Sequence, residues 1–124
     1  MPVQILLYQE ADGTCPAVEF LRAQPARVLV QAVKRVALLA EHGHQLHRPH
    51  AAYLENGIYE LRWHTGRVQY RILYFFHGRT AVVLAHALTK EETIPDADLA
   101  RATRRKDNFY ADPTPQTYPG GLHA

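Results

Sequence analysis

Cysteine is almost absent from this sequence, and Cys15 is the single example. An internal disulfide needs two cysteines and a cysteine-based zinc ribbon needs several, so both are excluded. The ordinary balance of 47% hydrophobic and 21% charged residues excludes disorder throughout the chain. A chain of 124 residues then suits one domain with one modest core.

Long hydrophobic runs are absent as well. No stretch approaches the roughly 18 apolar residues that are needed to cross a bilayer. The short apolar segment at 3–8 has no basic residues before it, unlike a secretory signal. We therefore expect a cytoplasmic protein with no membrane partner.

Charge of one sign is in small excess, because the chain has 14 Lys and Arg against 12 Asp and Glu. This excess is unevenly distributed. Residues 1–57 carry five basic and five acidic residues, whereas residues 58–110 carry nine and six, a balance of +3. An anionic partner would therefore contact the second half of the chain.

Hydrophobic periodicity predicts an α+β domain whose first half is mostly helical. A short strand at 4–9 precedes a helix at 15–23. Pro25 then opens a longer helix that ends at Gly43. Residues 44–54 are predicted to form a loop.

The second half predicts three more strands and a helix. The strand segments are 58–64, 68–77 and 80–88, and a helix from Pro95 to about residue 106 follows. The expected fold is an N-terminal strand and a helical hairpin packed on a small antiparallel sheet, with a C-terminal helix. This domain covers residues 1–110, and the Pro- and Gly-rich residues 111–124 are expected to be a flexible tail.

Four sequence blocks follow one another in this second half. They are Leu-Glu-Asn-Gly-Ile-Tyr-Glu-Leu-Arg at 54–62, Tyr-Arg-Ile-Leu-Tyr at 70–74, Leu-Ala-His-Ala-Leu-Thr-Lys-Glu at 84–91, and Pro95 ahead of an Ala-rich helix. Together they resemble the RelE/HigB toxin superfamily, especially its phage-derived HigB-like subgroup. The third block departs from the family pattern at two positions. The family has an aromatic residue where this chain has Leu88, and a second lysine where this chain has Glu91.

The resemblance implies a RelE-like fold and a toxin of a type II toxin–antitoxin system. Such toxins, where they are enzymes, are endoribonucleases that cleave mRNA, typically on the ribosome, without a metal or cofactor. The 2′-OH of the RNA attacks the adjacent phosphate, so the protein positions the backbone, moves protons and neutralises transition-state charge. The implied partners are RNA and a cognate antitoxin, which in HigB-like systems is a helix-turn-helix protein.

The predicted catalytic residues are Arg62, Arg71, Lys90 and His86, with Glu60 as an orienting residue. An arginine fork matches two phosphate oxygens, and Lys90 or His86 can carry a proton. From the residues alone, a cross-strand ion pair between Glu60 and an arginine is the commoner arrangement, whereas the resemblance favours phosphate binding. Both hold if Glu60 orients an arginine that also contacts phosphate. A surface role for Lys90 and a satisfied, half-buried state for His86 stay open.

A second set of residues is predicted to bind RNA through charge or base stacking. There are two simpler alternatives: the tyrosines pack in the core, and the basic residues complement the dipole at a helix C-terminus. This set consists of His64, Tyr70, Arg101, Arg104, Arg105, Lys106 and Tyr110. The histidines at 42, 44, 47 and 50 match no zinc spacing, so we expect a solvated loop, able to touch an RNA backbone.

Two other functions are compatible with the sequence. One is a ParE-like toxin that binds and inhibits DNA gyrase without cleaving RNA. The other is a catalytically decayed binding module of the same fold. Glu60, Arg62 and Lys90 favour the nuclease, whereas Glu91 in place of a lysine keeps the alternatives open.

Overall fold

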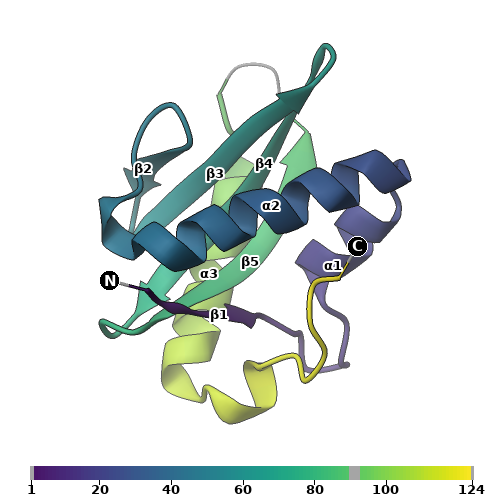
Figure 1. Cartoon of the computed structure of the whole chain (residues 1–124). Coiled ribbons are helices and arrows are strands. Elements are labelled where there is room, and N and C mark those ends of the chain that lie inside the picture. Colours follow the sequence, from purple (N-terminus) through teal and green to yellow (C-terminus); the bar gives the residue numbers. More distant parts are fainter. Residues whose placement is uncertain (1, 90–92, 124) are drawn as a thin grey trace.

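In the computed structural model of this chain, residues 2–89 and 93–123 are described. Its strands are β1 (Gln4–Leu7), β2 (Ala51–Glu55), β3 (Ile58–Thr65), β4 (Val68–His77) and β5 (Ala81–Thr89), and its helices are α1 (Pro16–Arg22), α2 (Ala26–His42) and α3 (Asp96–Ala111). The strands form one sheet in the order β1-β5-β4-β3-β2. Figure 1 shows α1 and α2 on one face of this sheet and α3 on the other.

The sheet is mixed, which corrects the expectation of a purely antiparallel one. Strands β2 to β5 pair antiparallel, but β1 pairs parallel with β5, with Gln4 beside Ala81. A parallel pair needs a long connection between its strands, and here all the intervening elements provide it. The first and last strands of the sequence are therefore neighbours.

The predicted helices and most strands lie within a few residues of their expected positions. Gly43 follows α2 with a φ of 55°, a conformation that favours glycine at the end of a helix. Helix α3 continues to Ala111, beyond the predicted end near residue 106. The predicted loop at 44–54 contains β2, an edge strand of five residues that is too short to give a clear alternating pattern.

Two hydrophobic cores lie on the two faces of the sheet. Leu61, Trp63 and Ile72 belong to the core under α1 and α2. Leu73 and Phe75 belong to the second core, under α3. Because side chains alternate along a strand, this arrangement places the predicted polar positions of β3 and β4 on the face that α3 covers.

The segment 111–124, expected to be flexible, folds back along β1 as far as it is described. The backbone N–H of Tyr118 donates to the Leu7 carbonyl at 2.8 Å, and that of Gln9 donates to the Gln116 carbonyl at 2.8 Å. The side chains of Tyr118 and Leu122 pack against the core under α1 and α2. These two side chains anchor the segment to the core, although its Pro and Gly content is typical of a flexible tail.

Within residues 2–89 and 93–123, no helix is both long enough and apolar enough to span a membrane.

The packed C-terminal segment predicts a measurable contribution of Tyr118 to stability. Tyr118→Ala should lower the free energy of unfolding by about 1–2 kcal/mol, less than the ~3–5 kcal/mol of a fully buried aromatic side chain, because Tyr118 is half-buried. Urea denaturation measures this change, with His123→Ala at an exposed position as the control. Equal stability of the two variants would show that the segment is not anchored.

Candidate functional site

Two arginines lie directly opposite one another at the centre of the candidate site. The register of β3 and β4 pairs Arg62 with Arg71, and both belong to the face of the sheet that α3 covers. Like charges directly opposite each other destabilise a sheet unless an anion compensates them. Glu60, two residues before Arg62 on the same face, provides that anion.

Glu60 contacts both arginines and is itself buried. Its Oε1 lies 2.7 Å from Arg71 Nε, and its Oε2 lies 3.8 Å from Arg62 Nη1. The Arg71 N–H does not point along the short contact, so this is an ion pair without hydrogen-bond geometry. One carboxylate between two guanidinium groups leaves a net charge of +1.

Arg71 keeps donor capacity although it is only 3% exposed. Its Nη1 makes two long contacts, at 3.4 Å to Gln69 Oε1 and at 3.5 Å to the Tyr70 carbonyl. A buried cation normally has short hydrogen-bond partners, because burial removes its water. The arrangement therefore suits an additional anion beside Arg71.

A cavity of about 370 Å³ opens beside these residues, and we call it the arginine cavity. Its walls come from β2, β3, β4 and the segment 93–99. Arg48, Arg62 and Arg71 line it together with Glu55 and Glu60, so the described part of its lining carries one more positive than negative charge. Sequence reasoning missed Arg48, which precedes Pro49 in the chain and gave no motif.

Of the other two predicted catalytic residues, only His86 lies within the described residues. Lys90 lies outside the described residues. His86 lies on β5 and is absent from the described lining of the arginine cavity. Of the four predicted catalytic residues, the described structure therefore brings together Arg62 and Arg71, with Glu60 between them.

His86 is held by partners on α3 through both of its ring nitrogens. Arg105 Nη1 donates to Nδ1 at 2.9 Å, so Nε2 carries the proton and donates to Asp98 Oδ1 at 2.7 Å. Burial lowers the pKa of His86 and the Arg105 charge adds to this effect, while the hydrogen bond with Asp98 opposes it. The ring is a neutral connector between the sheet and α3, the satisfied state left open by the sequence.

Arg105, which the sequence predicted to bind RNA, is buried. Leu99, Ala102 and Phe109 are the other buried residues of this helix, and Arg105 falls on the same helical stripe. Its Nε donates to Glu10 at 3.1 Å and its Nη1 to the Ala85 carbonyl at 2.9 Å. Arg105 therefore fixes α3 to the sheet and is not available to RNA.

The remaining charges of α3 are largely paired. Arg104 donates to Glu10 at 3.1 Å, and Arg101 lies 3.6 Å from Asp98. Burial alone would raise the pKa of Glu10, but hydrogen bonds from Arg104 and Tyr8 and the charge of Arg105 outweigh it and lower the pKa. Glu10 is therefore an anion at neutral pH that neutralises this part of the helix.

The predicted aromatic contacts with RNA lie elsewhere. Tyr70 is 5% exposed and packs in the core under α1 and α2, with its ring 5.6 Å from that of Trp63, so it cannot reach RNA. Tyr110 donates to the Phe76 carbonyl, and Lys106 lies over the Tyr110 ring at 5.7 Å. Neither Tyr70 nor Tyr110 lines the described part of the arginine cavity.

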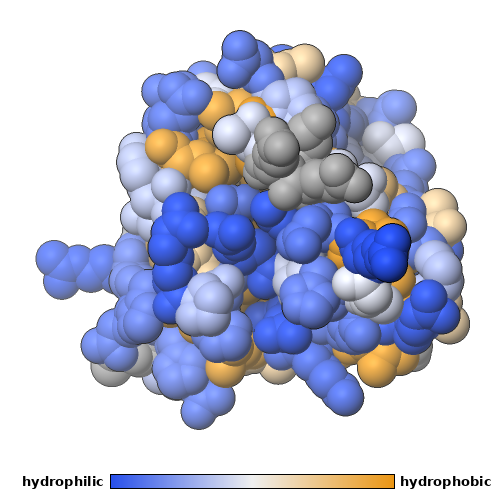
Figure 2. Space-filling view, turned by 90° about the horizontal axis from the view of Figure 1, so that it is seen from above, coloured by the Kyte–Doolittle hydropathy of each residue, from blue (hydrophilic) through white to orange (hydrophobic). Residues whose placement is uncertain are grey.

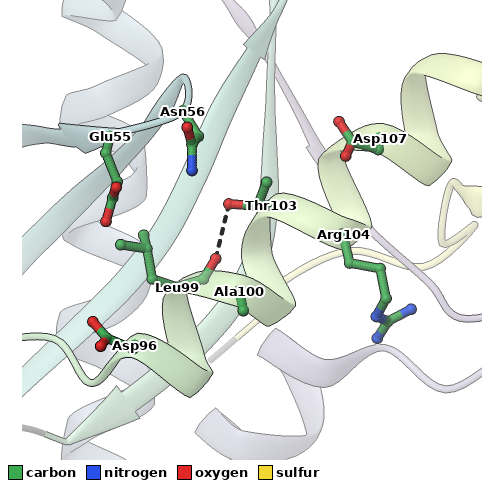
Figure 3. A pocket seen from close by; sticks show the side chains of 8 residues that line it. All are labelled: Glu55, Asn56, Asp96, Leu99, Ala100, Thr103, Arg104 and Asp107. Atoms are coloured by element: carbon green, nitrogen blue, oxygen red, sulfur yellow. Dashed lines mark hydrogen bonds between the residues drawn. The ribbon is translucent and has the colours of Figure 1, made fainter.

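A second hollow, of about 570 Å³, lies between the β2–β3 turn and α3. Figure 3 shows Glu55 and Asn56 from the turn facing residues of α3. Asp96 and Asp107 also line it, with Arg104 as its one basic residue in the described lining. We call it the acidic hollow, and it borders the arginine cavity through Glu55 and Leu99.

The state of His86 predicts a pH dependence of stability. Its pKa is lowered in the folded protein, so protons bind preferentially to the unfolded chain and stability falls as pH decreases through the ordinary value of 6.5. The free energy of unfolding should therefore decrease between about pH 7 and about pH 5, and less so in His86→Gln. Urea titrations measure it, with His123→Gln as the control; identical slopes in all three proteins would refute this role.

The comparison with protein families gives one match. Residues 19–107 match the family described as phage derived protein Gp49-like (DUF891). The match covers well over half of the chain and contains every residue of the arginine cavity. No curated protein matches the chain. This protein therefore belongs to the phage-derived Gp49-like family, a family of RelE/HigB-type toxins.

Proposed function

We propose that this protein is the toxin of a type II toxin–antitoxin system and cleaves mRNA as a metal-independent endoribonuclease. The observation that carries the proposal is the pair Arg62 and Arg71, opposite one another beside a cavity and sharing Glu60. Membership in a family of RelE/HigB-type toxins supports it.

The arginine pair suits a phosphodiester that approaches from the cavity. Each guanidinium can offer two parallel N–H groups to phosphate oxygens. Arg71 is buried on the central strand β4, whereas the Arg62 side chain is 29% exposed and has room to adjust. Fixed donors in a site shielded from water stabilise developing negative charge more strongly than mobile surface donors do.

The proposed reaction uses the 2′-OH of the RNA as nucleophile. Its oxygen forms a bond to phosphorus, the bond from phosphorus to the 5′-oxygen breaks, and the products carry a 2′,3′-cyclic phosphate and a 5′-OH. The 2′-OH loses a proton and the leaving oxygen gains one. Arg62 and Arg71 neutralise the transition state and Glu60 positions Arg71; Lys90, next in sequence after β5, stays the predicted proton carrier.

The family implies an antitoxin partner. We propose that this partner is a helix-turn-helix protein and that the mRNA is cleaved on the ribosome. An antitoxin that covers the arginine cavity would block the phosphate site directly.

The activity is tested with purified protein, single-stranded RNA and a metal chelator. Arg71→Ala and Arg71→Lys should each lower the cleavage rate, by roughly 10²–10³-fold for alanine, because a transition-state donor is lost. Arg67→Ala removes an equal charge from the exposed β3–β4 turn and should cleave normally. The same sequence made as DNA should stay intact, because it lacks the 2′-OH.

Two results would contradict the nuclease assignment. One is cleavage that is unaffected by the changes at Arg71, provided that thermal denaturation shows the variants to be folded. The other is growth arrest on expression with intact cellular RNA and relaxed DNA, which would favour inhibition of gyrase.

A further inference from the structure

A third hollow lies on the other side of Arg62 from the arginine cavity. It has a volume of about 290 Å³, and we call it the edge groove. The described backbone pairing on this side of β3 ends where the Arg62 N–H donates to the His50 carbonyl at 2.9 Å, so the part of β3 after Arg62 borders the groove as an open edge. Its basic lining residues in the described structure are Arg35 from α2, His50 from the loop before β2, and Arg62 and His64 from β3.

The two hollows that border the arginine cavity, the acidic hollow and the edge groove, differ in charge. Among the described residues, the lining of the edge groove contains no carboxylate, whereas the acidic hollow contains Glu55, Asp96 and Asp107. Arg62 belongs to both the arginine cavity and the edge groove, so the two form one continuous basic path. A polyanion is therefore attracted toward the open edge of β3 and repelled from α3.

Helix α3 offers little competing positive charge. Arg101 faces Asp98, and Arg104 and Arg105 share Glu10. Arg35, in contrast, forms no ion pair with any described carboxylate. Lys106 of α3 contacts the Tyr110 ring and lines none of the three hollows as described. Among the cations that do line them, those without a described ion pair are Arg48 in the arginine cavity and Arg35 in the edge groove.

The end of the molecule that carries the β3–β4 hairpin is hydrophilic. Figure 2 shows this end, where hydrophilic side chains cover the centre of the view and hydrophobic ones form separate patches.

The arginine cavity and the edge groove, at about 370 and 290 Å³, are each near the lower size of a small-molecule site. That size fits one nucleotide unit of a single strand rather than a duplex.

We propose that the edge groove binds the phosphodiester next to the scissile one in single-stranded RNA, with Arg35 and His64 as its main contacts. This inference rests on the proposed nuclease function and extends it, since it gives the substrate a path. The scissile phosphate lies at Arg62 and Arg71, and the chain continues over Arg62 along the edge of β3. His50 lines the same path and adds a further donor.

The proposal is tested by binding and by cleavage with the double variant Arg35→Ala/His64→Ala. Binding is measured by fluorescence anisotropy with a fully 2′-O-methylated single-stranded RNA, which cannot react. Loss of a charge-assisted contact should weaken binding by about tenfold and reduce the slope of log K against log salt by about 0.7 per phosphate contact. Arg79→Ala, which removes an exposed cation from the turn between β4 and β5, is the control and should bind normally.

Substrate length gives the second readout. The double variant should raise KM for a long RNA without changing kcat, and should cleave a dinucleotide, whose single phosphate fills only the arginine cavity, as the unchanged protein does. The proposal is overturned if the double variant binds the long RNA normally, if its cleavage rate falls as much on the dinucleotide, or if Arg79→Ala weakens binding equally. The anisotropy measurement needs no cleavage, so its result does not depend on whether Arg71→Ala changes the reaction. Failure of the edge-groove proposal can therefore be distinguished from failure of the nuclease assignment.

Discussion

The shared carboxylate of Glu60 is the constraint on which the site depends. Strand pairing forces Arg62 and Arg71 into direct opposition, and Glu60 is the anion that contacts both. Removing one partner of a buried pair costs about 3–5 kcal/mol, since it leaves a charge without compensation. A single carboxylate cannot neutralise two arginines, however, and the site is left with the excess charge that a phosphate group would neutralise.

Burial of both faces of the sheet determines where this excess charge can act. The core under α1 and α2 takes the apolar side of β3 and β4, so their polar side must face α3. Arg105 and His86 attach helix α3 to the sheet, and Glu10 and Asp98 pair with the arginines of this helix. The helix thus closes one side of the arginine cavity and leaves the side toward α2 positive. The ion pairs that attach α3 to the sheet therefore also determine where a phosphate chain can bind.

Sequence periodicity predicted β3 and β4, the strands that carry the two arginines, because local alternation is sufficient for that; it missed β2, which lines the same cavity. The alternation around Arg62 placed Glu60 and Arg62 on one face, and an ion pair of Glu60 with one of the two arginines was one of the arrangements left open. Long-range packing could not be read in this way. Arg105 has the composition of a surface residue but the helical spacing of a core residue, Tyr118 anchors a segment that looks flexible, and β1 pairs with a strand distant in sequence.

The central claim is that Arg71, although buried and paired with Glu60, contacts the phosphate of bound RNA. Proton–nitrogen correlation spectra of the arginine Nε–H groups test it most directly, during titration with 2′-O-methylated single-stranded RNA. The account predicts that the Arg71 and Arg62 signals, assigned through Arg→Lys variants, shift together and saturate with binding, while the Arg105 signal stays in place. Saturable RNA binding that leaves the Arg71 signal unchanged would contradict it.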